Sequence, residues 1–141
     1  MKNYDANQVT LIIAGLIIDS GFNDGDFVTV DQDSDDFTDV VGADGEVSRA
    51  RTNDNRATVK VTLMATSDGN SILSTLNNLD KSATNGAGVG PFFLRDKQGT
   101  ALYSSDACWV SKPPGVAYGK EVGTREWTVR IANLSRYDGG S

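Results

Sequence analysis

The sequence predicts a mainly β protein with one helix packed on its flank. Three observations support this fold class. β-branched residues alternate with polar residues in several segments, the 15 glycines fall largely in turn-like stretches while prolines number only 3, and a single segment carries apolar residues at helical spacing. The 141 residues have the usual size of one domain and contain no internal repeat. We therefore expect residues 1–141 to form a single β-sandwich or barrel-like domain.

The first predicted strands lie in the N-terminal half. QVTLIIAGLIID (residues 8–19) is rich in β-branched residues and predicts one long strand that bends near Gly15. FVTVDQ (27–32) alternates apolar and polar residues, and DGEVSRART (44–52) predicts a strand or one arm of a hairpin. RATVKVTLMA (56–65) alternates most regularly, with its valines on one face. These segments predict a sheet that is buried on one side.

The one predicted helix covers about residues 68–80, in the segment SDGNSILSTLNNLD. Ser67 or Asp68 can cap its start. Its apolar stripe at helical spacing consists of Ile72, Leu73, Leu76 and Leu79. We expect this stripe to lie over the sheet.

The C-terminal half predicts a hairpin, a long loop and a final strand. PFFLRDKQGTALYSSDACWV (91–110) reads as two strands that turn at residues 97–99. SKPPGVAYGKEVG (111–123) is the loop. In the final strand, alternation places Trp127 inward and Arg130 outward.

Charge is divided unevenly along the chain, whose formal net charge is −6. Ten of the 19 acidic residues fall between Asp19 and Glu46, where there is no lysine or arginine. The remaining nine acidic residues share the rest of the chain with all 13 basic residues. This distribution lacks the single basic patch that is typical of nucleic-acid-binding proteins.

The acidic stretch VDQDSDDFTDVVGADGEVSR (30–49) fits three interpretations. Its alternate aspartates match the first ligands of an EF-hand calcium loop. However, Asp36 stands where that loop needs a glycine, and Gly42 stands where it needs a bidentate glutamate. The other interpretations are a solvated loop and an acidic surface that lines a passage or meets a basic partner.

The sequence offers little to catalysis or cofactor binding. It has no histidine, which removes the commonest general base and a common metal ligand. Its single cysteine, Cys108, sits beside Trp109 in an apolar strand and is expected to be a packing residue. NGAGVG (85–90) lacks the spacing and the Lys-Ser/Thr pair of a phosphate loop. Carboxylate pairs that cleave glycosidic bonds stay a weak alternative, and we expect no enzyme activity, cofactor or metal.

Neither a signal peptide nor a membrane anchor is expected. The apolar run Leu11–Ile18 is only eight residues long, is interrupted by Gly15 and leads into an aspartate without a cleavage pattern. Synthesis in a reducing cytoplasm without membrane insertion follows. A β-rich chain also has edge strands, which are covered, blunted or used to add strands between copies. A repeated head-to-tail contact of that kind closes into a ring or grows into a filament.

Three segments of the chain resemble tail tube proteins of contractile-tailed bacteriophages. They are YDANQVTLIIAGLIIDSGFNDGDFVTV (4–30), FTDVVGADGEVSRARTNDNRATVKVTLMATSDGNSILSTL (37–76) and REWTVRIANL (125–134). The central segment is the most specific, with an acidic approach, a Gly-x-Asp-Gly turn, a polar strand, an alternating strand and a Ser-capped helix. Tubes of type VI secretion systems and pyocins share the architecture that this resemblance implies.

The resemblance implies a structural virion protein of the phage tail, assembled in the host cytoplasm. Its copies would form hexameric rings whose sheets join into an inner β-barrel, and the rings would stack into a hollow tube inside a contractile sheath. The tube would conduct genomic DNA without binding it specifically. Further partners would be the sheath, tape measure, baseplate and tail terminator proteins.

The resemblance also suggests roles for particular residues. A lumen rich in carboxylates would repel DNA phosphates. The candidates for the lumen wall are Asp24, Asp26, Asp31, Asp33, Asp35 and Asp36. The polar faces that carry Lys60, Thr128 and Arg130 would give a lumen of mixed charge if they also line it.

The predicted hairpin over residues 39–55 would stack against the next ring. Its candidate stacking residues are Gly42, Asp44, Gly45, Arg49, Arg51 and Arg56. The alternatives are a tube protein of a pyocin or type VI secretion-like machine, and a small calcium- or carbohydrate-binding β-sandwich module.

Overall fold

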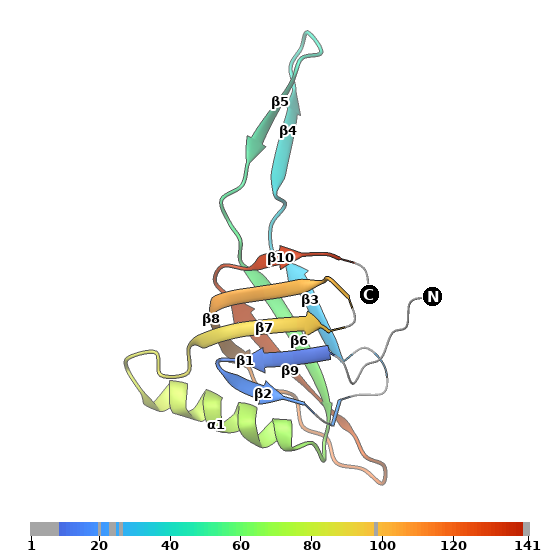
Figure 1. The fold of residues 1–141 in the computed structure, drawn as a ribbon, viewed down its shortest axis with the longest axis vertical. Coiled ribbons are helices and arrows are strands. Elements are labelled where there is room, and N and C mark those ends of the chain that lie inside the picture. The colour runs from blue at the N-terminus through green and yellow to red at the C-terminus, as the bar shows by residue number, and fades with distance from the viewer. Residues whose placement is uncertain (1–8, 20, 23–24, 26, 98, 140–141) are drawn as a thin grey trace.

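The computed structural model describes residues 9–19, 21–22, 25, 27–97 and 99–139. The prediction of a mainly β fold with one helix is confirmed (Figure 1). The strands are β1 (Val9–Ile13), β2 (Leu16–Ile18), β3 (Val28–Gln32), β4 (Phe37–Val41), β5 (Val47–Arg51), β6 (Ala57–Met64), β7 (Gly90–Asp96), β8 (Leu102–Lys112), β9 (Thr124–Ile131) and β10 (Ser135–Tyr137). The helix α1 spans Asp68–Ser82.

The main sheet has eight strands, in the order β2-β1-β7-β8-β9-β6-β3, with β10 paired to β8. All of these pairs are antiparallel. The sheet curls so that β1 and β7 lie in front of β6 and β9 (Figure 1), and buried side chains from both halves join one hydrophobic cluster. This is a β-sandwich-like body. The strands β4 and β5 pair only with each other and project from it as a long hairpin.

The expected long, bent first strand is wrong, because the chain reverses direction at Ala14-Gly15. Ile13 pairs with Leu16, so β1 and β2 form a hairpin with a two-residue turn. Both turn residues have positive φ, 52° at Ala14 and 84° at Gly15. That conformation matches a type I′ turn, whose twist suits the flanking strands and whose second position favours glycine.

The alternation predicted for the central strands is confirmed. Val59 and Val61 of β6 are fully buried, and they pair with Val129 and Trp127 of β9, which are also buried. The Trp127 indole keeps its polar atom satisfied, since Nε1 donates to Asn70 Oδ1 of α1 at 2.9 Å. β6 and β9 therefore form the back wall of the core.

The helix begins where the sequence predicts. Ser67 is the N-cap, and the Gly69 amide donates to its Oγ at 3.1 Å. Leu73 and Leu76 are buried against the sheet. Leu79, expected in the same stripe, is 51% exposed, because the C-terminal turns of α1 extend past the ends of β1 and β2 (Figure 1).

The C-terminal half also follows the prediction. β7 and β8 form the expected hairpin, whose turn includes Gln98, outside the described residues. The loop 113–123 joins β8 to β9, and the short strand β10 was not predicted. Among the described residues, no helix is both long and apolar enough to cross a bilayer.

Candidate functional site: the projecting hairpin

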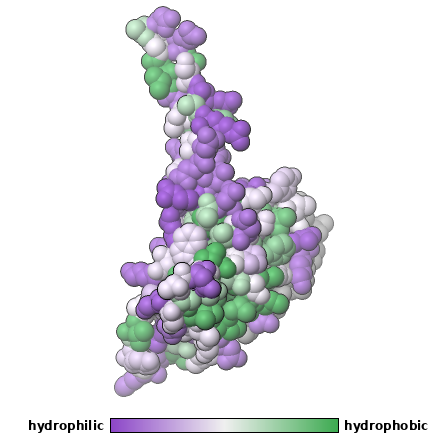
Figure 2. Space-filling view, turned by 90° about the vertical axis from the view of Figure 1, so that its left-hand side faces the viewer, coloured by the Kyte–Doolittle hydropathy of each residue, from purple (hydrophilic) through white to green (hydrophobic). Residues whose placement is uncertain are grey.

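The β4–β5 hairpin stands away from the body, and all of its strand residues are exposed. Four large apolar side chains are among them: Phe37, Val40, Val41 and Val47, with Val40 exposed to 70%. Figure 2 shows apolar surface near the end of the hairpin above a mainly hydrophilic stem. A lone two-stranded hairpin is at best marginally stable in water. Exposed apolar residues on such an element make the hairpin a candidate surface for contact with another molecule.

The hairpin loop is built by its two glycines. The Gly45 amide donates to the Gly42 carbonyl at 3.0 Å, and the Gly42 amide donates to the Glu46 carbonyl at 2.7 Å. Gly45 has a φ of 88°, which glycine adopts without strain. The Asp44 carboxylate accepts the Glu46 amide at 3.1 Å, as in an Asx turn. The predicted Gly-x-Asp-Gly turn therefore fixes an acidic tip.

The two faces of the hairpin differ in chemistry. Directly opposed residues share a face, and the side alternates along each strand. The pairs Phe37↔Arg51, Asp39↔Arg49 and Val41↔Val47 therefore lie on one face, whereas Thr38↔Ala50 and Val40↔Ser48 lie on the other. The Arg49 guanidinium lies over the Phe37 ring, 4.2 Å from its centroid. One face is charged and aromatic, and the other is small and neutral.

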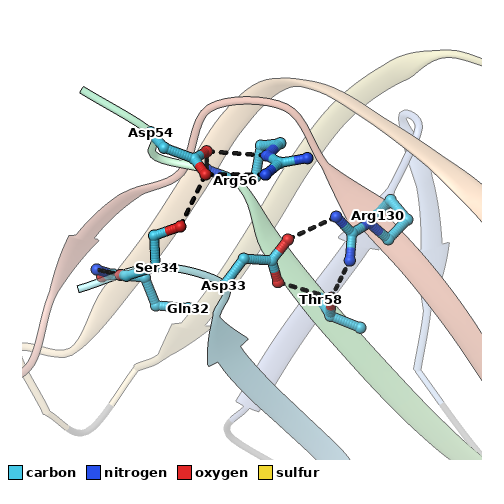
Figure 3. A network of polar contacts seen from close by, with 7 residues as sticks. All are labelled: Gln32, Asp33, Ser34, Asp54, Arg56, Thr58 and Arg130. Atoms are coloured by element: carbon cyan, nitrogen blue, oxygen red, sulfur yellow. Dashed lines mark hydrogen bonds and ion pairs between the residues drawn. The ribbon is translucent and has the colours of Figure 1, made fainter. Parts of the chain in front are cut away.

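A polar network fastens the hairpin to the body (Figure 3). Ser34 precedes β4 and Asp54 follows β5, and the Ser34 hydroxyl donates to Asp54 Oδ2 at 2.8 Å. Arg56 grips the same carboxylate with two hydrogen bonds of 2.9 Å each. The two legs of the hairpin are thus joined where they leave the sheet.

A second part of the network holds the first leg to the sheet (Figure 3). Asp33 comes directly after β3, and its carboxylate accepts from Thr58 of β6 at 2.9 Å and pairs with Arg130 of β9. Arg130 also donates to the Thr58 hydroxyl at 2.6 Å. Three neighbouring strands therefore contribute to the position of the hairpin base.

These contacts set the protonation of the network. The hydrogen bonds from Arg56 and then from Ser34 hold the pKa of the Asp54 carboxyl well below its usual range. The same carboxylate raises the pKa of Arg56. Both groups therefore stay charged at neutral pH, and the legs remain joined.

The candidate lumen residues do not form one uniform surface. Asp24 and Asp26 lie outside the described residues. Asp31 is exposed on the outward face of β3, and Asp35 is exposed in the turn before β4. Asp36 accepts a hydrogen bond from the Gln32 amide at 2.7 Å.

Asp33 differs from the other aspartates because it faces Arg130. The outward face of β6 and β9 also carries Lys60, whose ammonium lies 3.9 Å from Glu126. The polar face of this part of the sheet is therefore mixed in charge. Among the described residues, no three acidic or thiol side chains are close enough to share a metal ion, and the contacts of Asp33 offer no support for the calcium loop.

The stacking candidates separate into two places. Gly42, Asp44 and Gly45 form the tip, and Arg49 and Arg51 lie on β5. Arg56, the sixth candidate, lies below the hairpin, where it pairs with Asp54. The paired strands β4 and β5 cover residues 37–51 rather than the predicted 39–55, so Arg56 lies outside them.

Sequence reasoning missed a hollow at the opposite end of the molecule. It has a volume of about 500 Å³ and is lined by the loop 113–123 together with the first turns of α1 and the start of β9. The loop was predicted, but its apolar residues have no periodicity that could assign them to a surface. No sequence signal could have found it, because the 91% exposure of Tyr118 is known only from the structure.

The family model of the bacteriophage PhiTE tail tube protein matches residues 7–139. The chain belongs to this tail tube family. It is also 30% identical to "Structural protein ORF10" of Pseudomonas phage KPP10 over 145 residues, which covers 99% of this chain and 84% of that protein. The resemblance seen in the sequence is therefore confirmed, and the protein is a structural component of a phage tail.

Solved structures of contractile injection systems share the fold of this tail tube protein. A chain from the structure of the sheath/tube terminator of the extracellular contractile injection system PVC has a TM-score of 0.62 at 9% identity, over 98% of this chain and 99% of that chain. A chain of the PVC sheath-tube complex gives 0.60 at 7% identity, over 96% and 91%. The tube-terminating cap of the anti-feeding prophage gives 0.60 at 5% identity, over 97% and 92%.

Proposed function

We propose that this tail tube protein assembles into hexameric rings, which stack into the hollow conduit for DNA ejection inside a contractile sheath. The observation that carries the proposal is the β4–β5 hairpin, an exposed element with an apolar end that has no partner within the described chain. A hairpin that lies along the long axis of the subunit can reach the ring above or below. The protein acts by assembly and performs no catalysis.

The free edges of the main sheet support ring formation. β2 and β3 are the two ends of the strand order, so each has one unpaired side among the described residues. β2 also exposes Leu16 and Ile17. An exposed apolar edge strand is a template for pairing with another chain. Pairing between the β2 and β3 regions of neighbouring copies would join their sheets into an inner barrel.

An acidic bore would let DNA pass without being held. The outward face of β3 presents Asp31, and Asp35 lies just beyond that strand. Carboxylates repel phosphate, and they keep DNA away from the lysine and arginine contacts that produce nonspecific affinity. In the neighbouring strands the basic residues Arg130 and Lys60 face Asp33 and Glu126, so their charge is partly compensated.

The assembled tube would meet several other proteins of the tail. Its outer wall would contact the sheath, its lumen would hold the tape measure protein during assembly, and its ends would contact the baseplate and the tail terminator. The likeness of the fold to chains of sheath-tube and terminator assemblies supports the sheath and the terminator as partners. The finished tube would be part of the virion, assembled in the host cytoplasm.

Negative-stain electron microscopy of the purified protein over a range of protein and salt concentrations tests the proposal. We expect rings with sixfold symmetry that elongate into hollow tubes as concentration rises. Rings of another symmetry would overturn the hexamer. A monomer at all concentrations, with a melting temperature that rises on addition of calcium, would favour a small binding module instead.

A further inference from the structure

The hollow at the end of the molecule opposite the hairpin is an apolar surface without a cover. Its walls include Pro114, Val116 and Val122 from the loop, and Asn70 and Trp127 lie in its floor. Val116 and Val122 are exposed to 62% and 64%. Their exposure, together with that of Tyr118, places three exposed large apolar side chains around this one hollow.

The chain itself carries an exposed element whose chemistry matches that of the hollow. The hairpin tip and the loop 113–123, which lines the hollow, lie at opposite ends of the longest axis of the molecule (Figure 1). Val41 and Val47 are directly paired at the tip and form one apolar knob. A knob at one end and a hollow at the other make a heterologous contact, which repeats from copy to copy along one direction.

Charge complements the apolar match. The tip carries Asp44 and Glu46 and no basic residue until Arg49. At the hollow, Arg125 lies over the Tyr118 ring, 5.5 Å from its centroid. Arg125 is one of the residues that line the hollow, as is Glu121.

The surroundings of the hollow add positive charge. Lys112 and Lys120 are exposed and adjoin lining residues in the chain. With Arg125 they are three basic residues against two carboxylates, Glu121 and the adjoining Glu126, so the rim has a balance of +1 where the tip is net acidic. Opposite charges at the rim of an apolar contact fix its orientation and speed its formation.

We infer that the hollow formed by the loop 113–123, α1 and β9 is the receptor for the β4–β5 hairpin tip of a second copy of this chain. The inference rests on the proposed function and specifies which surface of the next subunit receives the hairpin. Val41 and Val47 enter the hollow beside Tyr118, and Asp44 and Glu46 meet the basic rim. The contact gives the tube a direction, with all hairpins pointing the same way.

Cross-linking of full-length cysteine variants tests this contact. The variant Ala43→Cys/Val122→Cys carries one thiol at the tip and one at the hollow, and a short bis-maleimide can join it into covalent chains. The matched control is Ala43→Cys/Asn78→Cys, whose second thiol lies on the exposed side of α1 away from the hollow. The native Cys108 is buried, and burial raises the pKa of its thiol, so it reacts slowly in both variants.

We expect a ladder of dimers, trimers and longer chains for the hollow variant at a rate at least about tenfold above the control, equivalent to roughly 1.4 kcal/mol of preferential contact. Equal rates would overturn the docking site. Tubes without a preferential ladder would leave the proposed function standing and refute the receptor. A ladder without rings or tubes would support the docking contact and refute the ring assembly.

Discussion

The body of the protein and its hairpin are both built from antiparallel strands, but they differ in whether their apolar side chains are covered. β6 alternates between buried and exposed residues along its whole length, whereas every residue of β4 and β5 is exposed. Both regions consist of antiparallel strand pairs that carry large apolar side chains. The body covers its apolar side chains with its own second layer, whereas no other part of the described chain covers the hairpin. The difference separates residues that stabilise the monomer from residues available for assembly.

The largest expected difference is between substitutions of two phenylalanines, one in the body and one on the hairpin. Phe92 is buried in the body, and Phe37 is half exposed on the hairpin. Phe92→Ala should lower the free energy of unfolding by about 3–5 kcal/mol through lost burial and the cavity left behind. Phe37→Ala should change it by about 0.5 kcal/mol or less, as exposed substitutions do.

Urea denaturation of the monomer measures both phenylalanine variants, and sedimentation measures their assembly. Phe37→Ala should raise the concentration at which tubes form while leaving unfolding unchanged. If Phe37→Ala unfolds as easily as Phe92→Ala, the hairpin belongs to the monomer core and the comparison fails.

Two leucines on α1 allow the same comparison of a buried residue with an exposed residue within one helix. Leu76→Ala should destabilise the monomer by about 2–5 kcal/mol because its side chain is buried against the sheet. Leu79→Ala removes the same atoms from an exposed position and should stay within about 0.5 kcal/mol of the wild type. Thermal unfolding of the two variants side by side is the measurement. Equal losses would mean that the last turn of α1 is packed.

Charge reversal on β5 should affect assembly and spare the fold. Arg49→Glu/Arg51→Glu reverses two positive charges on the β5 stem, below the acidic tip, where they would meet acidic residues of the next ring, and we expect shorter tubes whose length depends differently on salt. Arg95→Glu/Lys97→Glu on the body makes the same change in net charge and serves as the control. Tube length by electron microscopy across a salt series is the readout. Tubes of normal length and salt tolerance for the β5 variant would exclude these arginines from stacking.

The smallest effect is expected at acid pH, from the contacts of Asp54 that hold the base of the hairpin. The folded-state pKa of Asp54 is depressed, so its contacts stabilise the chain above the unfolded-state pKa of about 3.9 and that contribution is lost as the pH falls further. The protection of amides near residues 34 and 56, measured as exchange relative to the intrinsic rate at each pH, should therefore fall below about pH 4.

A local readout of the anchor is needed because Asp138 also has a depressed pKa, caused by Arg136 and Tyr103, and titrates in the same direction. Asp54→Asn keeps the shape of the side chain and removes its charge. It should exchange quickly near the hairpin base at neutral pH and lose the acid-dependent change there. Unaltered exchange in this variant would show that Ser34 and Asp54 do not hold the hairpin.

Most of the fold could be predicted because it depends on local patterns. Alternation in β6 and β9, the cap at Ser67 and the glycine turn at Gly42 and Gly45 all follow from side-chain period and backbone geometry within a few residues. The first hairpin was mistaken for a bent strand, because Gly15 permits either structure and only the pairing of β1 with β2 decides between them.

The candidate site could be predicted only in part, for the same reason. The acidic stretch and the hairpin were visible in the sequence, but the partners of its charges come from distant segments. Asp33 meets Arg130 across 97 positions of the chain, and Arg56 turned out to hold the hairpin base. The hollow combines residues from a loop, a helix and a strand, which no local pattern links.

Most of the strands, the helix, the turn chemistry and the family of this protein can be predicted from its sequence, since each depends on neighbouring residues or on similarity along the chain, whereas the β1–β2 hairpin and β10 were not predicted. Which apolar residues are covered and which charges are paired becomes visible only in the folded chain. Coverage and pairing depend on segments that the chain brings together by folding. Assembly would depend on the exposed hairpin and the distant hollow. These two surfaces could be recognised only in the folded structure, because folding determines which residues stay exposed.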